Sequence, residues 1–143
     1  MTTTSQPYVL SNPISLLTDK PREEFTREDL IQVIEQKAIE RITFHYTAMD
    51  GQYKELKIPV SNRRQAERIL ADGERVDGSS LFRGMVDVDV SDLYVVPEYK
   101  SAFLNPFGEP SLEFTCRYLS AHGDLVKFAP DAILHNAAEL FRR

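Results

Sequence analysis

The sequence predicts an α+β domain in which a helix crosses a small mixed sheet. Three observations lead to this class. A capped amphipathic helix is expected over residues 27–38, and a hairpin with alternating apolar and polar residues follows it. A shorter helix and two further apolar strands come later in the chain. Helices and strands that each carry one apolar face fold by packing those faces together in layers.

The composition limits the classes of function. The 143 residues fit one domain of ordinary size. With 22 acidic and 17 basic residues the net charge is −5, and the absence of a basic stripe argues against nucleic-acid and anionic-membrane partners. The chain lacks a secretory pattern at residues 1–7, an apolar run of about 18 residues and a second cysteine beside Cys116. We therefore expect a soluble, cytoplasmic protein.

Residues 1–24 are predicted to form an N-terminal arm that is partly disordered. Pro7, Pro13 and Pro21 interrupt any periodicity, so only short apolar groups can anchor the arm. An arm that docks on another subunit is the alternative.

A helix is predicted over residues 27–38. Thr26 can cap it, Asp29 stands at the third helical position of a capping box, and Phe25 can pack on Leu30. One face of the helix is apolar: Leu30, Ile31, Ile34 and Ala38.

A β-hairpin turns at Asp50-Gly51, a dipeptide that favours the positive φ of tight hairpin turns. Pro59 in the return strand is typical of a sheet edge. His45 falls on the polar face of the first strand without a Cys or His neighbour, so we expect a surface side chain. The apolar face comprises Ile42, Phe44, Tyr46, Ala48, Leu56, Ile58 and Val60.

A short helix is expected over residues 61–71, with Ser61 as its cap and Gly73 at its end. Its inward side chains are Ala66, Ile69 and Leu70. Three basic residues lie on it, Arg63, Arg64 and Arg68. A solvated helix face is the favoured interpretation, and a contact with an acidic neighbouring subunit is the alternative.

The stretch Arg75-Val76-Asp77-Gly78-Ser79-Ser80 places one carboxylate between a strand and a Gly-Ser-Ser turn. Taken alone, Asp77 is typical of an ordinary turn. Further on, Asp87 and Asp89 stand two apart on an extended segment. Because the surrounding sequence supplies no other ligand, a solvent-facing strand edge is favoured over a metal site.

The C-terminal third contains a compact loop at 101–108, a strand at 112–118 and a helix that opens at Pro130. Cys116 lies on the strand's apolar face, so we expect a buried core residue and not a nucleophile. The last helix has an apolar stripe of Ile133, Ala137, Leu140 and Phe141. The whole order of elements is consistent with a β-grasp-like domain.

From about residue 40 to 140 the chain resembles the N-terminal domain of glutamine synthetase and the beginning of its catalytic domain. Five landmarks stand in the family's order. They are the hairpin ending in Ile58-Pro59-Val60, Val76-Asp77-Gly78-Ser79-Ser80, Ser91-Asp92-Leu93-Tyr94-Val95-Val96-Pro97, Ala102-Phe103-Leu104-Asn105-Pro106-Phe107, and the strand 112–118 with the helix start at 130–133. Asn105 and Ala129-Pro130-Asp131 depart from the family's pattern, which indicates a divergent branch.

The resemblance implies a ligase that makes glutamine from glutamate, ammonia and ATP through a γ-glutamyl phosphate. It implies that Asp77 is a catalytic residue that binds ammonium, with Ser80 as a supporting ligand, in a site completed by a neighbouring subunit. A carboxylate attracts the ammonium cation and assists its deprotonation, and only the deprotonated form is a nucleophile. Gly78 lets the backbone turn sharply behind that carboxylate.

The resemblance also implies a division of the chain. After the arm, residues 25–120 are the β-grasp-like domain, and 121–143 are a linker and the first helix of a catalytic domain outside this sequence. That domain would hold ATP and Mg²⁺ or Mn²⁺, and the present chain would hold neither cofactor nor metal and be inactive alone. The expected partners are the catalytic domain and identical subunits in a ring. The alternative is a non-catalytic interaction module that binds a protein partner.

Overall fold

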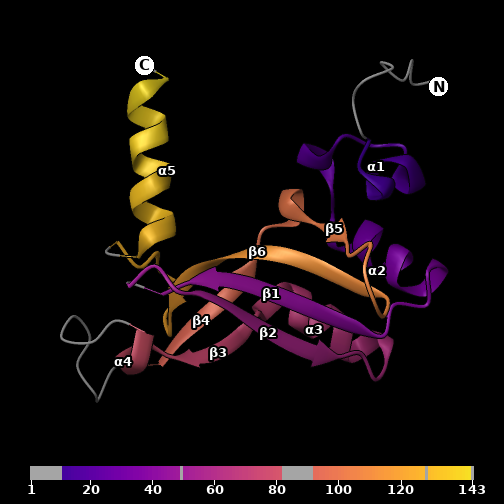
Figure 1. Cartoon of the computed structure of the whole chain (residues 1–143), viewed down its shortest axis with the longest axis horizontal. Helices are drawn as coiled ribbons and strands as arrows, with labels where there is room; N and C mark the ends of the chain where they lie inside the picture. The colour runs from indigo at the N-terminus through magenta and orange to yellow at the C-terminus, as the bar shows by residue number, and fades with distance from the viewer. Residues whose placement is uncertain (1–10, 49, 82–91, 128, 143) are drawn as a thin grey trace.

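The computed structural model describes residues 11–48, 50–81, 92–127 and 129–142. Six strands of these residues form one sheet, in which β2, β1, β6, β4 and β3 lie side by side and β5 pairs with β6 (Figure 1). Only β1 and β6 run parallel, and the other pairs are antiparallel. The strands are β1 Arg41–Thr47, β2 Tyr53–Pro59, β3 Glu74–Asp77, β4 Asp92–Pro97, β5 Phe103–Leu104 and β6 Ser111–Ser120.

Among the described residues, two helices, α1 and α2, precede β1 in the sequence, and three more follow it. The helix α3 packs against both α2 and β4, and α1 packs against α2 and β5. The helices are α1 Pro13–Thr18, α2 Arg27–Gln36, α3 Arg63–Asp72, α4 Gly78–Leu81 and α5 Pro130–Phe141, with short 3-10 turns η1 Arg22–Glu24 and η3 Tyr99–Ser101. The mixed sheet and its helices confirm the predicted α+β class.

The start of α2 is as predicted, and its end is not. The Thr26 side chain accepts from the Asp29 backbone and the Asp29 side chain accepts from the Thr26 backbone, which completes the capping box. The helix ends at Gln36, and the prediction that Ala38 faces the core is wrong. Ala38 is exposed with φ 49°, because the chain turns there to enter β1, and Ile39 is buried in its place.

The apolar core lies between the central strands and the helices α2 and α3. Phe44 of β1 and Phe114 of β6 are fully buried and meet edge to face, with ring centroids 6.2 Å apart. Burial of one such side chain stabilises the fold by roughly 1.5–3 kcal/mol. Apolar residues of the helices complete the core: Leu30, Ile31, Val33, Ile34, Ala66, Ile69 and Leu70.

Arg63 ties α3 to α2 on the surface of the molecule. Its guanidinium donates to Glu28, Glu35 and Glu67 at 2.8–3.1 Å. Hydrogen bonds from Arg63 to Glu67 and Glu28 raise the pKa of Arg63 above its ordinary value. The arginine is half exposed, as the predicted solvated face requires, but its charge is paired within its own chain.

Gly73 closes α3, as predicted, although the helix is capped by Asn62 and not by Ser61. The Asn62 side chain accepts from the Gln65 backbone at 2.8 Å. Gly73 has φ 69° and ψ −157°, and a Cβ built on it would lie 2.1 Å from the carbonyl oxygen of Val95. Only glycine allows the chain to pass so close to β4 before β3 begins.

The described part of the N-terminal segment is attached to the domain. Ile14 of α1 is fully buried, and the Asn12 side chain donates to the Ala102 carbonyl at 2.9 Å. These contacts provide the kind of apolar anchor that the sequence led us to expect. The boundaries of the predicted arm and domains, after residue 24 and after residue 120, stay predictions.

The helix α5 projects away from the sheet (Figure 1). Of its predicted apolar stripe, Ile133, Leu140 and Phe141 are exposed, and Phe141 is 92 % accessible. Ala132, in the first turn, is the one buried residue that the structure describes in α5. Among the described helices, none is long and apolar enough to cross a membrane.

Candidate functional site

The predicted site residue Asp77 lies at the end of an edge strand. It is the last residue of β3, it is exposed, and Gly78 begins α4 directly after it. Ser80 belongs to α4, and its side chain lies outside what the structure describes. The strand-to-helix turn therefore presents Asp77 at the rim of the sheet.

Asp92 is the cross-strand neighbour of Asp77. Sequence reasoning missed this pairing. The two residues are directly paired at the ends of β3 and β4. Like charges at such positions repel, and Arg75 offsets part of this through its guanidinium, 3.5 Å from the Asp92 carboxylate. Carboxylates gathered at one rim favour a cation. In the sequence Asp92 is only part of a landmark, because its pairing with Asp77 depends on the fold.

Asp87 and Asp89 lie outside the described residues. Both interpretations of this acidic segment, the solvent-facing strand edge and the metal site, therefore stay predictions.

The prediction that His45 is a surface side chain is wrong. His45 is 5 % exposed, and its Nε2 lies 2.6 Å from Oε1 of Glu113, which is 4 % exposed. Two aromatic rings lie nearly parallel to the imidazole, Tyr53 with its centroid at 5.2 Å and Phe103 at 6.1 Å. Alternation along β1 correctly assigned His45 to the face opposite Phe44, but β5 and Tyr53 cover that face too.

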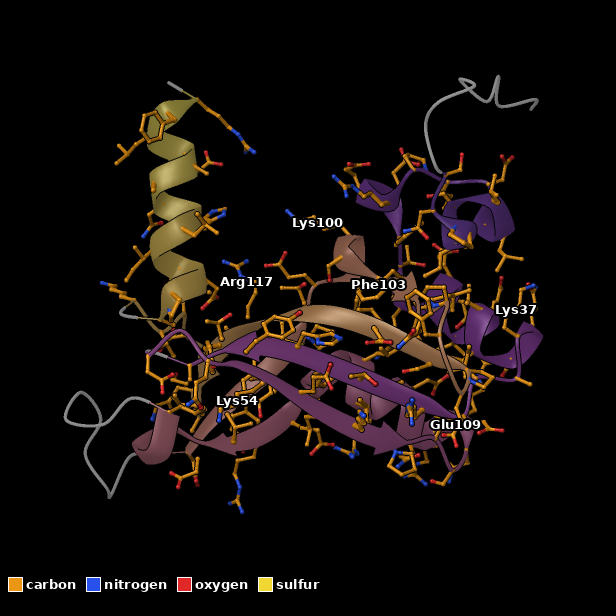
Figure 2. All side chains as sticks on the ribbon, viewed as in Figure 1. Lys37, Lys54, Lys100, Phe103, Glu109 and Arg117 are labelled. Atoms are coloured by element: carbon orange, nitrogen blue, oxygen red, sulfur yellow. The ribbon has the colours of Figure 1, made fainter. Side chains whose placement is uncertain are left out.

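Buried polar side chains form a row on this second face of β1 and β6. Besides His45 and Glu113, Thr43 and Ser111 are buried there, and their hydroxyl oxygens are 2.8 Å apart. Figure 2 shows Phe103 on β5 beside these strands. A polar group costs free energy when buried unless it finds a hydrogen-bond partner, so this row requires its mutual contacts.

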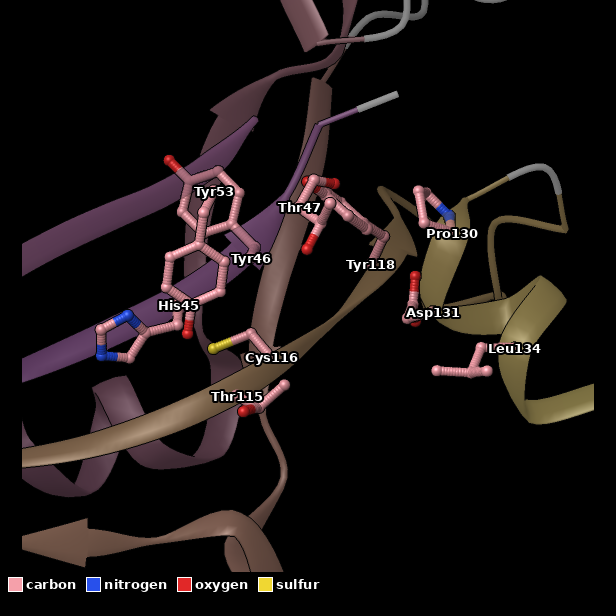
Figure 3. Close-up of a pocket in the computed structure, with 10 residues that line it drawn as sticks. All are labelled: His45, Tyr46, Thr47, Tyr53, Thr115, Cys116, Tyr118, Pro130, Asp131 and Leu134. Carbon is pink, nitrogen blue, oxygen red and sulfur yellow. The ribbon is translucent and has the colours of Figure 1, made fainter. Parts of the chain in front are cut away.

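A pocket of about 330 Å³ opens between the sheet and the start of α5 (Figure 3). Burial raises the pKa of Cys116, one of its lining residues, so the thiol stays neutral. The prediction that Cys116 is a buried core residue is confirmed. Burial also raises the pKa of Asp131, against the opposing effect of nearby backbone amides of Tyr118, Asp131 and Ala132. The pocket wall is mostly apolar and includes Tyr46, Tyr53, Tyr118 and Leu134.

A small mixed sheet with packed helices, and with the exposed carboxylate of Asp77 at the end of its edge strand, defines an α+β domain of the β-grasp class. The family of glutamine synthetase β-grasp domains matches residues 38–121, and the chain belongs to this family. The recognition made from the landmarks and the β-grasp-like fold class are therefore confirmed. The matched segment contains β1 to β6 and the loop of Asp77, and it ends before α5.

Known relatives are consistent with this membership. Glutamine synthetase of Staphylococcus aureus strain Mu50 is 30 % identical over 87 residues, which are 61 % of this chain and 19 % of that protein. Among solved structures, glutamine synthetase of Plasmodium falciparum superposes with a TM-score of 0.65 at 19 % identity, over 81 % of this chain and 22 % of that one. GmaS without ligand gives 0.64 at 18 %, over 74 % of this chain and 24 % of that one. The chain thus spans about a fifth of its curated relative, and the solved structures support the fold alone.

Proposed function

We propose that this chain is the N-terminal domain of a glutamine-synthetase-like ligase that joins ammonia to glutamate at the expense of ATP, through a γ-glutamyl phosphate. In this proposal Asp77 completes the ammonium site of a neighbouring identical subunit, and Ser80 supports it. The observation that carries the proposal is the position of Asp77, exposed where edge strand β3 passes into α4. An edge position leaves the carboxylate accessible to another subunit.

The rim chemistry suits a cation. Asp77 and Asp92 are cross-strand partners, so their side chains leave the same face of the sheet. Ammonium is attracted by this negative charge, and a carboxylate near it can accept the proton that ammonium must lose before it attacks. A pre-positioned nucleophile also avoids much of the entropic cost of a bimolecular step.

The proposed enzyme also has a catalytic domain and identical partner subunits. ATP and Mg²⁺ or Mn²⁺ would bind in a catalytic domain, and residues 121–143 would be the linker to it together with its first helix, α5. The exposed apolar side chains of α5 fit burial by such a domain. The partners would be that domain and identical subunits in a ring, in the cytoplasm. A stand-alone interaction module is not favoured, because the matched relative is a glutamine synthetase.

The test is Asp77→Asn in the full-length protein that carries this domain. We expect the rate at limiting ammonium to fall about 100-fold or more, the loss typical of a missing general base, while ATP binding stays unchanged. Asp72→Asn is the matched control, since Asp72 is an exposed carboxylate at the end of α3. Unchanged turnover of the Asp77 variant at limiting ammonium would refute the assigned role.

A second experiment distinguishes the ligase from the module. An antibody against this domain should detect a native polypeptide several times larger than 16.4 kDa. The purified 143-residue chain alone should form no glutamine from glutamate, ammonia and ATP. A native species of 16.4 kDa, or activity of the isolated chain, would contradict the proposal.

A further inference from the structure

Three strands bring nitrogen and oxygen atoms that could bind a metal ion together on the second, polar face of β1 and β6. His45 comes from β1, Glu55 from β2 and Glu113 from β6. Each residue offers one atom that could bind a metal ion, a ring nitrogen or a carboxylate oxygen, and these three atoms lie within 4.8 Å of one another. None of these residues belongs to the Asp77 rim, so the cluster is separate from the proposed ammonium site.

The hydrogen bonding of His45 fixes the proton on one ring nitrogen. Glu113 Oε1 lies 2.6 Å from Nε2, and an ionised carboxylate can only accept, so opposite an ionised Glu113 it is Nε2 that carries the hydrogen. In the neutral ring Nδ1 is then a bare acceptor. It lies 3.6 Å from Oε1 of Glu55, and no donor among the described residues reaches it. Two acceptors facing each other across such a gap repel unless a proton or a metal cation stands between them.

We propose that His45 Nδ1 and the Glu55 carboxylate bind a divalent transition-metal ion, with Glu113 as a positioning residue. Bonds of about 2.0–2.2 Å to a tetrahedral Zn²⁺ place two donors about 3.4 Å apart, close to the observed 3.6 Å. Glu55 is about half exposed, so water can fill the remaining coordination positions. One imidazole with carboxylate suits Zn²⁺, Co²⁺ or Ni²⁺ better than Mg²⁺ or Ca²⁺, which prefer oxygen ligands alone.

Glu113 and the aromatic rings hold the imidazole of His45 in place. A metal-bound histidine usually donates its other N–H to a carboxylate, which sets the tautomer and the ring orientation. Glu113 makes this contact through Oε1, from a site with 5 % side-chain exposure, and its Oε2 has no hydrogen-bond partner within the described segments. Stacking of Tyr53 on the imidazole restricts rotation of the ring.

The experiment is a calorimetric titration of the 143-residue chain, without an affinity tag, with Zn²⁺ and separately with Mg²⁺. We expect saturable Zn²⁺ binding at one site and none of Mg²⁺. Glu55→Gln should weaken Zn²⁺ binding at least tenfold, and Glu113→Gln by about 10–100-fold, the usual effect of losing an outer carboxylate. The matched controls, His122→Gln and His135→Gln, replace exposed histidines and should bind as the parent does.

Nitrogen chemical shifts of the imidazoles report on the atom that binds. Zn²⁺ should shift Nδ1 of His45, while Nε2 keeps its hydrogen and its hydrogen bond to Glu113. Because Glu55 is on the edge strand and half exposed, Glu55→Gln should keep the parent circular dichroism, so its loss of binding is not a folding effect. Binding that survives Glu55→Gln, shifts confined to His122 or His135, or no saturable Zn²⁺ binding would each overturn the proposal.

Discussion

Replacement of Gly73 by alanine tests how the chain enters the edge strand that presents Asp77. Gly73 stands between α3 and β3, at φ 69° and ψ −157°. The added Cβ would lie 2.1 Å from the Val95 carbonyl oxygen and 2.9 Å from its carbon. These are backbone atoms, so no side chain can rotate away. Either β3 must separate from β4, or the end of α3 must move.

Two costs add to give the magnitude. A non-glycine residue in this backbone region costs about 1–3 kcal/mol. Separation of β3 from β4 weakens hydrogen bonds that each contribute about 1 kcal/mol. We therefore expect Gly73→Ala to lower the free energy of unfolding by about 3–5 kcal/mol, a large part of the 5–15 kcal/mol typical of a domain. The Tm should fall by about 10 °C or more.

Urea denaturation followed by circular dichroism measures this loss, and Gly51→Ala is the matched control. Gly51 also has positive φ, 84°, but nothing lies within 4 Å of a Cβ placed there. That variant carries the backbone cost alone, about 1 kcal/mol. If Gly73→Ala destabilises the chain no more than Gly51→Ala does, the close approach to Val95 does not constrain the fold and the reasoning fails.

Two further predictions concern single contacts. Burial raises the pKa of Asp29, but hydrogen bonds from Lys20 and Thr26 outweigh it, and the net pKa is lowered. The unfolded chain thus takes up the proton first, so the stability due to Asp29 is present above pH about 4 and is lost as pH falls through the folded pKa. Asp29→Asn should cost about 1–2 kcal/mol at pH 7, and this cost should shrink as the pH is lowered below about 4. Urea titrations across that pH range measure it, and a pH-independent loss would contradict the reasoning. The Tyr118 hydroxyl donates to the Thr47 carbonyl at 2.8 Å. Tyr118→Phe should therefore lower the free energy of unfolding by about 1 kcal/mol in the same urea assay. An unchanged urea midpoint would show that this hydrogen bond does not contribute to stability.

Local signals were sufficient where the determinants are close in sequence. The capping box of Thr26 and Asp29 and the Asp50-Gly51 turn each depend on residues within one turn of the chain, and both are present as predicted. Pro59 likewise indicated an edge strand, and β2 is one. The end of α2 was less predictable, because Ala38 has good helix propensity and the chain reverses there to reach β1.

The burial of His45 depends on long-range pairing. Alternation assigns a residue to a face of a strand but does not say what covers that face. Phe103 belongs to β5, which pairs with β6, and neither partner is adjacent to β1 in sequence. The candidate site divides in the same way. The Asp-Gly-Ser-Ser motif points to Asp77, whereas its neighbour Asp92 emerges only from the register of β3 and β4.

The parallel pairing of β1 with β6 has a consequence for how the chain folds during synthesis. The two strands form the middle of the sheet, yet contacts such as Thr43 to Ser111 join residues 68 positions apart. At about 5–20 residues per second, the ribosome needs roughly 3–14 s to make that interval. A hairpin of β1 and β2 is only marginally stable by itself. During that time the apolar side of β1 lacks its partner, which leaves it open to non-native contacts until β6 arrives.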